Sequence, residues 1–264
     1  MKLSPSEINK YITTNDRDFK RFKMHYTPKE IQSIESFKLN TYKGFNHFGS
    51  YKNLKGINEF LSSLGDNDNI LVNRLEKIIN NIIKKVLKGY KMEHFWMTIR
   101  VSMPNNLYDI PRWHKDGSFF PNDPTNPKTS KFVTVMKGPG TLLIKGNKRI
   151  NKIYDDSFER ERNETTPTSS IEEQIKVSDK YRPILAKELS KEKVIQLKNN
   201  QGLVFFTGNG VIKKPITSTS YVGILDNGAL HSEPKIDAPR MFISIIPGTE
   251  ENIMALQERW SKKK

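Results

Sequence analysis

The distribution of apolar and polar positions changes character near residue 92. Before that point the clearest pattern is helical, and its longest stretch is residues 68–88, "DNILVNRLEKIINNIIKKVLK". Apolar residues there recur at a spacing that gathers them on one broad face, namely Ile70, Leu71, Leu75, Ile78, Ile79, Ile82, Ile83, Val86 and Leu87. The acidic start and lysine-rich end suit the helix dipole, and Gly89 offers a stop. The pattern predicts an amphipathic helix that braces a sheet.

Shorter helix signals precede this stretch. In "SPSEINKYI" Ser4 is placed to cap a helix whose first position is Pro5, and "TPKEIQSIESF" repeats the arrangement from Thr27. A third segment, "KGINEFLSSLG", ends on Gly65. We therefore expect residues 1–92 to form a helical or mixed region that packs on the rest of the chain.

After Gly89 the period changes to that of strands. Residues 93–103, "EHFWMTIRVSM", alternate between two faces. One face carries Phe95, Met97, Ile99, Val101 and Met103, and the other carries His94, Trp96, Thr98, Arg100 and Ser102. The apolar face can pack on the preceding helix, so the polar and aromatic face is predicted to look into a cavity.

More strand patterns follow, separated by turns rich in glycine, proline and asparagine. They are "RWHKDGSFF", "KFVTVMK", "TLLIKG", "KVIQL", "GLVFFTG", "YVGILD" and "RMFISII". So many short strands predict a mainly β sandwich or barrel. We expect a core over residues 93–250, insertions near 151–192 and 208–222, and a basic C-terminal helix or tail over 251–264.

Composition and charge narrow the class of protein. The chain has 264 residues, a formal net charge of +15 and no cysteine, which excludes disulfides and thiolate metal sites. The lysines are scattered and no nucleic-acid motif accompanies them, so we ascribe the charge to composition in preference to nucleic-acid binding. No apolar run approaches the roughly 18 residues of a membrane span, and no secretory signal is visible. The expected location is intracellular, cytoplasmic or nuclear, away from membranes.

Candidate chemistry is concentrated in "PRWHKDGSFF". His114 and Asp116 are separated by one residue, so on an extended backbone both side chains project to the same face. Gly117 then permits a sharp turn. Taken alone, the pair is equally a polar turn whose carboxylate caps the next loop. By contrast, His25 and His47 lie in polar, lysine-rich surroundings and are predicted to be structural.

The segment "GALHSEPKIDAPRMFISIIPG" supplies what such a pair lacks. His231 follows a glycine, and Arg240 opens the apolar strand "RMFISII", on which Ser244 shares its face. A charged arginine in a buried strand needs an anion. Two histidines and one carboxylate suit Fe(II) and leave coordination positions open, while an arginine can hold a carboxylate through two hydrogen bonds. Together these residues indicate a metal that chelates a keto acid.

The pattern His114-x-Asp116, then His231, then Arg240, resembles the Fe(II)/2-oxoglutarate-dependent dioxygenases, and its spacing resembles the prolyl hydroxylase branch. The resemblance covers about residues 93–247. It implies a double-stranded β-helix, or jelly roll, with Fe(II) held by His114, Asp116 and His231. It also implies 2-oxoglutarate bound by Arg240 and Ser244, dioxygen as the oxidant and ascorbate as a supporting reductant. The implied reaction hydroxylates a C–H bond and releases succinate and CO2.

The second contact to 2-oxoglutarate is open. Prolyl hydroxylases usually carry a tyrosine on the strand after the first motif, and "FVTVMKGPG" has none. Thr134, Lys137, Thr141 and Tyr108 are the candidates to replace it. The residues proposed to line the substrate site are Trp96, Arg100, Phe119 and Phe120, although core packing explains the two phenylalanines equally well.

The sequence leaves the substrate open as well. A protein side chain is favoured on the spacing, nucleic acid comes second on charge alone, and a small molecule third. The alternative of a different class is a metal-binding or nucleic-acid-binding β-barrel without turnover. The oligomeric state is not indicated by any pattern in the chain.

Overall fold

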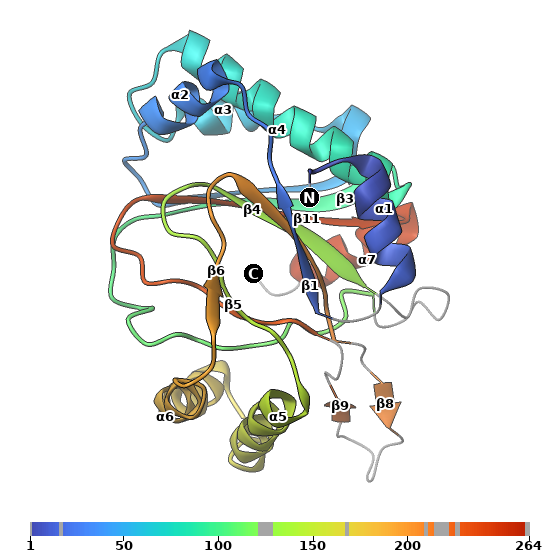
Figure 1. The fold of residues 1–264 in the computed structure, drawn as a ribbon, viewed down its shortest axis with the longest axis vertical. Helices are drawn as coiled ribbons and strands as arrows, with labels where there is room; N and C mark the ends of the chain where they lie inside the picture. Colours follow the sequence, from blue (N-terminus) through green and yellow to red (C-terminus); the bar gives the residue numbers. More distant parts are fainter. Residues whose placement is uncertain are drawn as a thin grey trace.

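A computed structural model describes residues 2–15, 18–120, 129–166, 169–208, 211–213, 222–224 and 228–261 (Figure 1). In chain order the elements are α1 (Pro5–Thr14), β1 (Phe19–Lys23), α2 (Pro28–Ser36), β2 (Lys43–Ser50), the short 3-10 helix η1 (Tyr51–Asn53), α3 (Ile57–Ser62), α4 (Asn69–Tyr90), β3 (His94–Ser102), β4 (Ser130–Lys137), β5 (Leu142–Ile144), α5 (Lys148–Asn163), α6 (Ile171–Glu188), β6 (Val194–Gln196), β7 (Gln201–Phe206), β8 (Val211–Lys213), β9 (Val222–Ile224), β10 (Leu230–Ser232), β11 (Arg240–Gly248) and α7 (Glu250–Ser261).

The strands form antiparallel sheets. The main sheet has six strands in the order β1-β7-β4-β11-β3-β2, and a smaller sheet has the order β10-β5-β6. Strand β8 lies in the predicted insertion at 208–222 and pairs with β9, which begins at the end of that insertion; most of the insertion lies outside the described residues. The mainly antiparallel, helix-flanked architecture agrees with the predicted strand-rich core.

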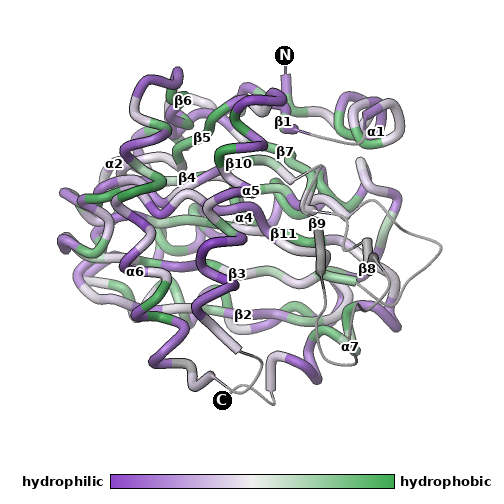
Figure 2. Tube along the Cα trace, turned by 90° about the horizontal axis from the view of Figure 1, so that it is seen from below, coloured by the Kyte–Doolittle hydropathy of each residue, from purple (hydrophilic) through white to green (hydrophobic). Residues whose placement is uncertain are grey.

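Helices α2, α3 and α4 cover one face of the main sheet, and the small sheet lies on the other side (Figure 1). The first face holds the largest core, in which the apolar stripe of α4 meets inward residues of β3, β4 and β11. A second, smaller core joins the two sheets through Val133, Leu203 and Phe205 on one side and Leu143 on the other. Figure 2 shows the hydrophobic stretches of β5 and β7 that contribute to it.

Helix α4 forms where the pattern predicts a helix, and its ends have identifiable causes. The Asp68 side chain accepts a hydrogen bond from the backbone of Leu71 at 2.7 Å and caps the start. The end lies beyond Gly89, at Lys91 in the left-handed conformation with φ of 56°. Gly89 has a different role from the expected stop, because a Cβ there would lie 2.7 Å from Cβ of Ile8. The glycine lets α1 approach α4 closely.

Residues 1–92 are more than a helical cover. Besides α1 to α4 they supply β1 and β2, the two edge strands of the main sheet. Strand β2 pairs with β3 from Lys43 to Ser50, and β1 pairs with β7 from Phe19 to Lys23. The sheet therefore uses strands from both sides of the boundary expected near residue 92.

One expectation on local structure is wrong. The segment "RWHKDGSFF" forms no extended strand and makes a single β-bridge, between His114 and His231. The insertion at 151–192 is built mainly from α5 and α6, and the C-terminal segment forms α7, with residues 262–264 outside the described part. Within the described ranges, no helix is both long and apolar enough to cross a membrane.

Two isoleucines of α4 give a matched test of whether the apolar face of this helix stabilises the main sheet. Ile83 is fully buried against the sheet, whereas Ile70 on the same helix has a relative exposure of 71%. Ile83→Ala should lower the free energy of unfolding by about 2–5 kcal/mol, because it removes buried methyl groups and leaves a cavity. Ile70→Ala should change it by less than about 0.5 kcal/mol. Urea unfolding of both variants measures this, and equal losses would contradict the assignment of the apolar face.

Candidate metal centre and its cavity

The two histidines of the site are held together by their backbones. The His114 amide donates to the carbonyl of His231 at 2.9 Å, and the His231 amide donates back at 3.0 Å. His231 lies in β10, which is anchored by pairing with β5. The bridge sets the two imidazoles beside each other, with 4.2 Å between the ring centroids.

Each imidazole is also oriented by a local carbonyl. Nδ1 of His114 lies 2.8 Å from the carbonyl oxygen of Arg112, and Nδ1 of His231 lies 2.9 Å from that of Ala229. A carbonyl only accepts, so Nδ1 carries the proton and donates in both cases. This tautomer leaves both Nε2 atoms bare, which is the form in which a histidine binds a metal through Nε2.

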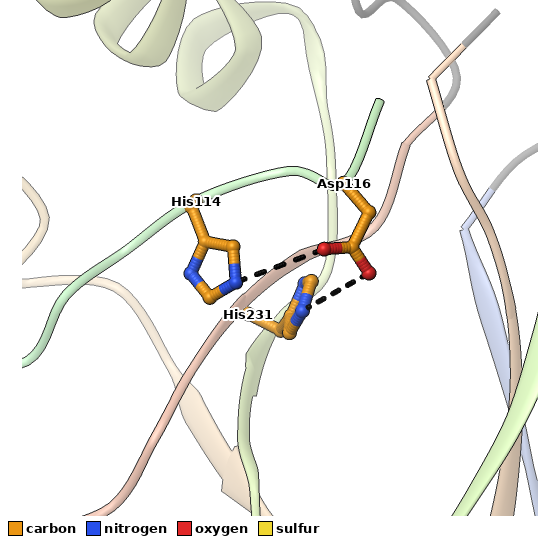
Figure 3. A group of neighbouring side chains, drawn as sticks. All are labelled: His114, Asp116 and His231. Atoms are coloured by element: carbon orange, nitrogen blue, oxygen red, sulfur yellow. Dashed lines mark ion pairs between the residues drawn. The ribbon is translucent and has the colours of Figure 1, made fainter. Parts of the chain in front are cut away.

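Asp116 completes the group. Its Oδ1 lies 3.9 Å from Nε2 of His114 and its Oδ2 lies 3.6 Å from Nε2 of His231 (Figure 3). One ligand atom from each of the three residues falls within 4.8 Å of the others. The structure thus brings together the three residues that the sequence nominated as metal ligands.

The protonation states suit a metal. Burial lowers the pKa of His231 to about 3, with the neighbouring His114 as the next cause, so this imidazole is neutral at physiological pH. Burial alone would raise the pKa of Asp116, but Lys131 and then the two histidines outweigh it and hold that pKa well below its usual range. Neutral imidazole and ionised carboxylate are the forms that metal binding requires.

The carboxylate of the group has one close cationic partner. Asp116 Oδ2 is buried and lies 2.5 Å from the Lys131 ammonium. A buried carboxylate is normally paired in this way. The bare Nε2 atoms and this oxygen together fit a divalent cation with nitrogen and oxygen ligands.

The group opens into a cavity of about 440 Å³ on the face of the main sheet opposite α4. Its walls come from alternate residues of β2, β3, β4 and β11. Those that matter for chemistry are Trp96, Arg100, Arg112, Phe119, Lys131, Thr141, Glu233, Arg240, Ser244 and Trp260.

Arg240 is the deepest cation in this cavity, with a relative exposure of 3%. Its Nε donates to the carbonyl of Pro139 at 2.9 Å, and a terminal nitrogen donates to the Thr141 hydroxyl at 3.3 Å. Burial lowers the pKa of Arg240 to about 10, so the group is still charged at neutral pH. No carboxylate of the described chain forms an ion pair with it. A buried, charged guanidinium without a carboxylate favours an anionic ligand.

Four other nominated residues also line the cavity: Ser244, Trp96, Arg100 and Phe119. Phe120 is not among the lining residues, because it packs on the inner side of the wall against Ile246 and against Ile253 of α7. His94 approaches Glu250 at 3.9 Å and is not part of the cavity wall.

The candidates for the second cosubstrate contact separate clearly. Thr141 lines the cavity and touches Arg240. Thr134 lies on the other face of β4, where its hydroxyl donates to the carbonyl of Gln201 at 2.9 Å. Lys137 donates to the carbonyls of Glu35 and Phe37, and Tyr108 lies against Arg182, both away from the cavity. Strand alternation explains the placement of Thr134, because Lys131 and Val133 occupy the cavity face.

Sequence reasoning missed Lys131, the Arg112–Glu233 ion pair at 2.9 Å and Trp260. The signal for Lys131 was present in "SKFVTVMK", where a lysine shares one strand face with two valines and therefore needs a buried partner. Nothing local marks Trp260, which reaches the cavity only because α7 folds back on β2 and β3.

Comparison with known proteins gives no match to any family model and no match among curated proteins. Similar solved structures are dioxygenases and hydroxylases. The Kdo hydroxylase KdoO, a non-heme Fe(II) and α-ketoglutarate-dependent dioxygenase solved with succinate and Fe(III), has a TM-score of 0.48 and 13% identity over 98% of this chain and 91% of its own. A Pseudomonas putida prolyl-4-hydroxylase has a TM-score of 0.39 and 6% identity over 93% and 98%.

The rice dioxygenase for auxin oxidation has a TM-score of 0.39 and 9% identity, over 92% of this chain and 78% of its own. Because all three TM-scores are below 0.5 and the identities are low, the assignment of an activity has to rest on the side chains of the site.

The metal centre can be tested without any assumption about turnover. We expect wild-type protein to bind one equivalent of Mn(II) in isothermal titration. Asp116→Ala and His231→Ala should each weaken that binding by at least about 100-fold, because loss of a ligand costs no less than loss of a residue that orients one. His25→Gln is the control, since His25 is exposed and remote from the group. Undiminished binding by Asp116→Ala would rule out this ligand set.

Proposed function

We propose that this chain is an Fe(II)- and 2-oxoglutarate-dependent dioxygenase that hydroxylates a C–H bond, and that its two sheets form a double-stranded β-helix. One observation carries the proposal: the His114, Asp116 and His231 ligand atoms converge in the same cavity as Arg240, a buried cation that has no carboxylate partner among the described residues. A site for a metal and a site for an anion thus share one chamber.

The three ligands would hold Fe(II) on one side and leave positions open for further ligands. Bound Fe(II) would supply the redox chemistry by which dioxygen and 2-oxoglutarate convert a substrate C–H to C–OH, with succinate and CO2 as the other products. The three residues offer two imidazole nitrogens and one carboxylate oxygen, which suit this ion. The carbonyls of Arg112 and Ala229 keep both imidazoles in the ligating tautomer.

Arg240 would bind the distal carboxylate of 2-oxoglutarate. Its guanidinium is fixed by Pro139 and Thr141, so little freedom is lost when the anion arrives. The Thr141 hydroxyl accepts from Arg240 and keeps its own proton free to donate to the same carboxylate. We therefore propose Thr141 as the second cosubstrate contact, with Ser244 on the adjacent wall.

The remaining walls would exclude water and position the substrate. Val133, Phe205 and Ile246 supply an apolar lining, which strengthens the electrostatic contacts made in the chamber. Trp96, Arg100 and Phe119 line the part proposed for the substrate, where Tyr42 and Trp260 have relative exposures of 71% and 40%. Such an exposed rim suits a side chain presented on a protein, and nucleic acid or a small molecule remains the alternative.

Arg240 gives a quantitative test of the cosubstrate assignment. With Fe(II), ascorbate and 2-oxoglutarate, wild-type protein should form succinate. Arg240→Gln should raise the KM for 2-oxoglutarate on the order of 10- to 100-fold, the equivalent of a lost charge-assisted hydrogen-bond pair. The KM of Arg240→Lys for 2-oxoglutarate should lie between those of wild type and Arg240→Gln, because lysine keeps the charge but loses the forked geometry of the guanidinium. An unchanged KM in Arg240→Gln would refute the anion site.

Succinate formation distinguishes an enzyme from a β-barrel that binds a metal without turnover. Asp116→Ala should reduce succinate formation by at least about 100-fold while circular dichroism still shows a folded protein, with a lower unfolding midpoint because Lys131 loses its carboxylate partner. His25→Gln should match wild type. A wild-type protein that binds Mn(II) and 2-oxoglutarate tightly but forms no succinate with Fe(II) would favour a non-catalytic binding protein.

The substrate class can be tested through coupling. We expect mixed peptides to accelerate succinate formation above the rate without substrate, and oligonucleotides and metabolite pools to have less effect. Binding to duplex and single-stranded DNA is measured in parallel at several salt concentrations. Nucleic acid would replace peptide as the favoured substrate if oligonucleotides stimulate turnover and bind with a steep salt dependence.

A further inference from the structure

Lys131 occupies an unusual place for a lysine. It lies on the cavity face of β4, and its side chain has a relative exposure of 12%. The ammonium is 2.5 Å from Oδ2 of Asp116 and lies over the rings of Phe205 and Phe119, at 4.8 and 5.7 Å from their centroids. Within the described structure, Asp116 is the carboxylate that neutralises it. A buried ammonium needs such a partner, and aromatic faces supplement it.

The oxygen that Lys131 contacts is also a metal-ligand atom. Asp116 Oδ2 lies 3.6 Å from Nε2 of His231, inside the group that can hold a metal. A divalent cation bound there would lie close to the ammonium, and like charges repel with an energy inversely proportional to their separation. The ammonium and the metal therefore compete for one carboxylate oxygen.

We propose that Lys131 is an internal counter-cation of the metal centre, which holds Asp116 in the metal-free protein and yields it when the metal binds. This inference rests on the proposed function in that it takes the His114, Asp116 and His231 group to be a metal site. Lysine suits the role because its compact charge sits on a flexible four-carbon stem, which permits the ammonium to move while the backbone of β4 stays in place.

Release of the ammonium has a second consequence. The freed cation stays on the cavity wall that also carries Ser244 and Arg240, since Val133 of β4 pairs with Ser244 of β11. It then favours an anionic ligand of the metal, so metal and anion assist each other's binding. By linkage the assistance is reciprocal and of the same size in both directions. Lys131 would thereby couple cosubstrate binding to occupancy of the metal site.

Mn(II) titration of four proteins tests this without relying on turnover. They are wild type, Lys131→Met, which keeps the length and removes the charge, Lys131→Arg, which keeps the charge, and Lys23→Met, which removes an exposed lysine of β1. Each is titrated with and without saturating 2-oxoglutarate. Without 2-oxoglutarate, Lys131→Met should bind Mn(II) at least tenfold more tightly than wild type, and Lys23→Met should equal wild type.

The coupling between 2-oxoglutarate and Mn(II) binding should be weaker in Lys131→Met than in wild type. In wild type and Lys131→Arg, 2-oxoglutarate should tighten Mn(II) binding by a factor several times larger than in Lys131→Met. Metal-free Lys131→Met should also melt at a lower temperature than wild type, because Asp116 loses its counter-cation. If Lys131→Met does not fold, Lys131→Gln replaces it in the same titrations.

Two results would overturn the inference, and they are distinguishable. Equal or weaker Mn(II) binding by the neutral variants, with normal binding by wild type and Lys23→Met, would show that Lys131 does not compete with the metal and would leave the proposed function intact. No Mn(II) binding by wild type would overturn the metal centre itself, and this inference with it.

Discussion

The pair of backbone hydrogen bonds between His114 and His231 is the constraint on which the site depends. It fixes the separation of two proposed ligands from distant parts of the chain, and residues 112–120, which carry His114, have no other β-pairing with the described residues. That segment is supported from behind by the insertion helices. Trp113 is buried in a cluster with Tyr154 of α5 and Leu185 of α6, and the Tyr154 hydroxyl is 3.2 Å from the Lys115 amide, which donates to it. Helices α5 and α6 of the insertion therefore help to position the proposed metal ligands.

Charge in the cavity is incompletely balanced by the chain itself. Four cationic side chains line it, Arg100, Arg112, Lys131 and Arg240, against two carboxylates, Asp116 and Glu233. Lys131 pairs with Asp116 and Arg112 pairs with Glu233, so Arg100 and Arg240 have no ion-pair partner among the described residues. A metal bound by Asp116 would displace Lys131 from it and add positive charge, which would increase the demand for anions. A dianionic cosubstrate meets that demand, so the two proposed ligands complement each other electrostatically.

The sequence predicted those features whose pattern is complete within one segment of the chain. The stripe of α4, the spacing of His114 and Asp116, and a charged Arg240 on an apolar strand each carry their own physical reason. Thr134 and Lys131 show the limit, because alternation divides β4 into two faces without telling which one meets the cavity. That choice is made by partners on β7 and β11. The role of Gly89 likewise depends on Ile8, eighty-one residues earlier by the numbering, and edge strand β1, "FKRFK", is too short and charged to stand out.

The largest core lies on the face of the main sheet opposite the cavity, where its packing compensates for destabilising groups in the site. A buried guanidinium with no carboxylate partner among the described residues and two adjacent imidazoles both lower the stability of the ligand-free protein. These groups lie on one face of the main sheet, and the apolar contacts of α4 lie on the other, through the same strands β3, β4 and β11. Because inward and outward residues alternate along each strand, packing on the α4 face holds the cavity residues in register. The packing of α4 on the sheet thus offsets the destabilising groups of the site, and the same contacts position the site residues. Ligand binding would add further stability by mass action.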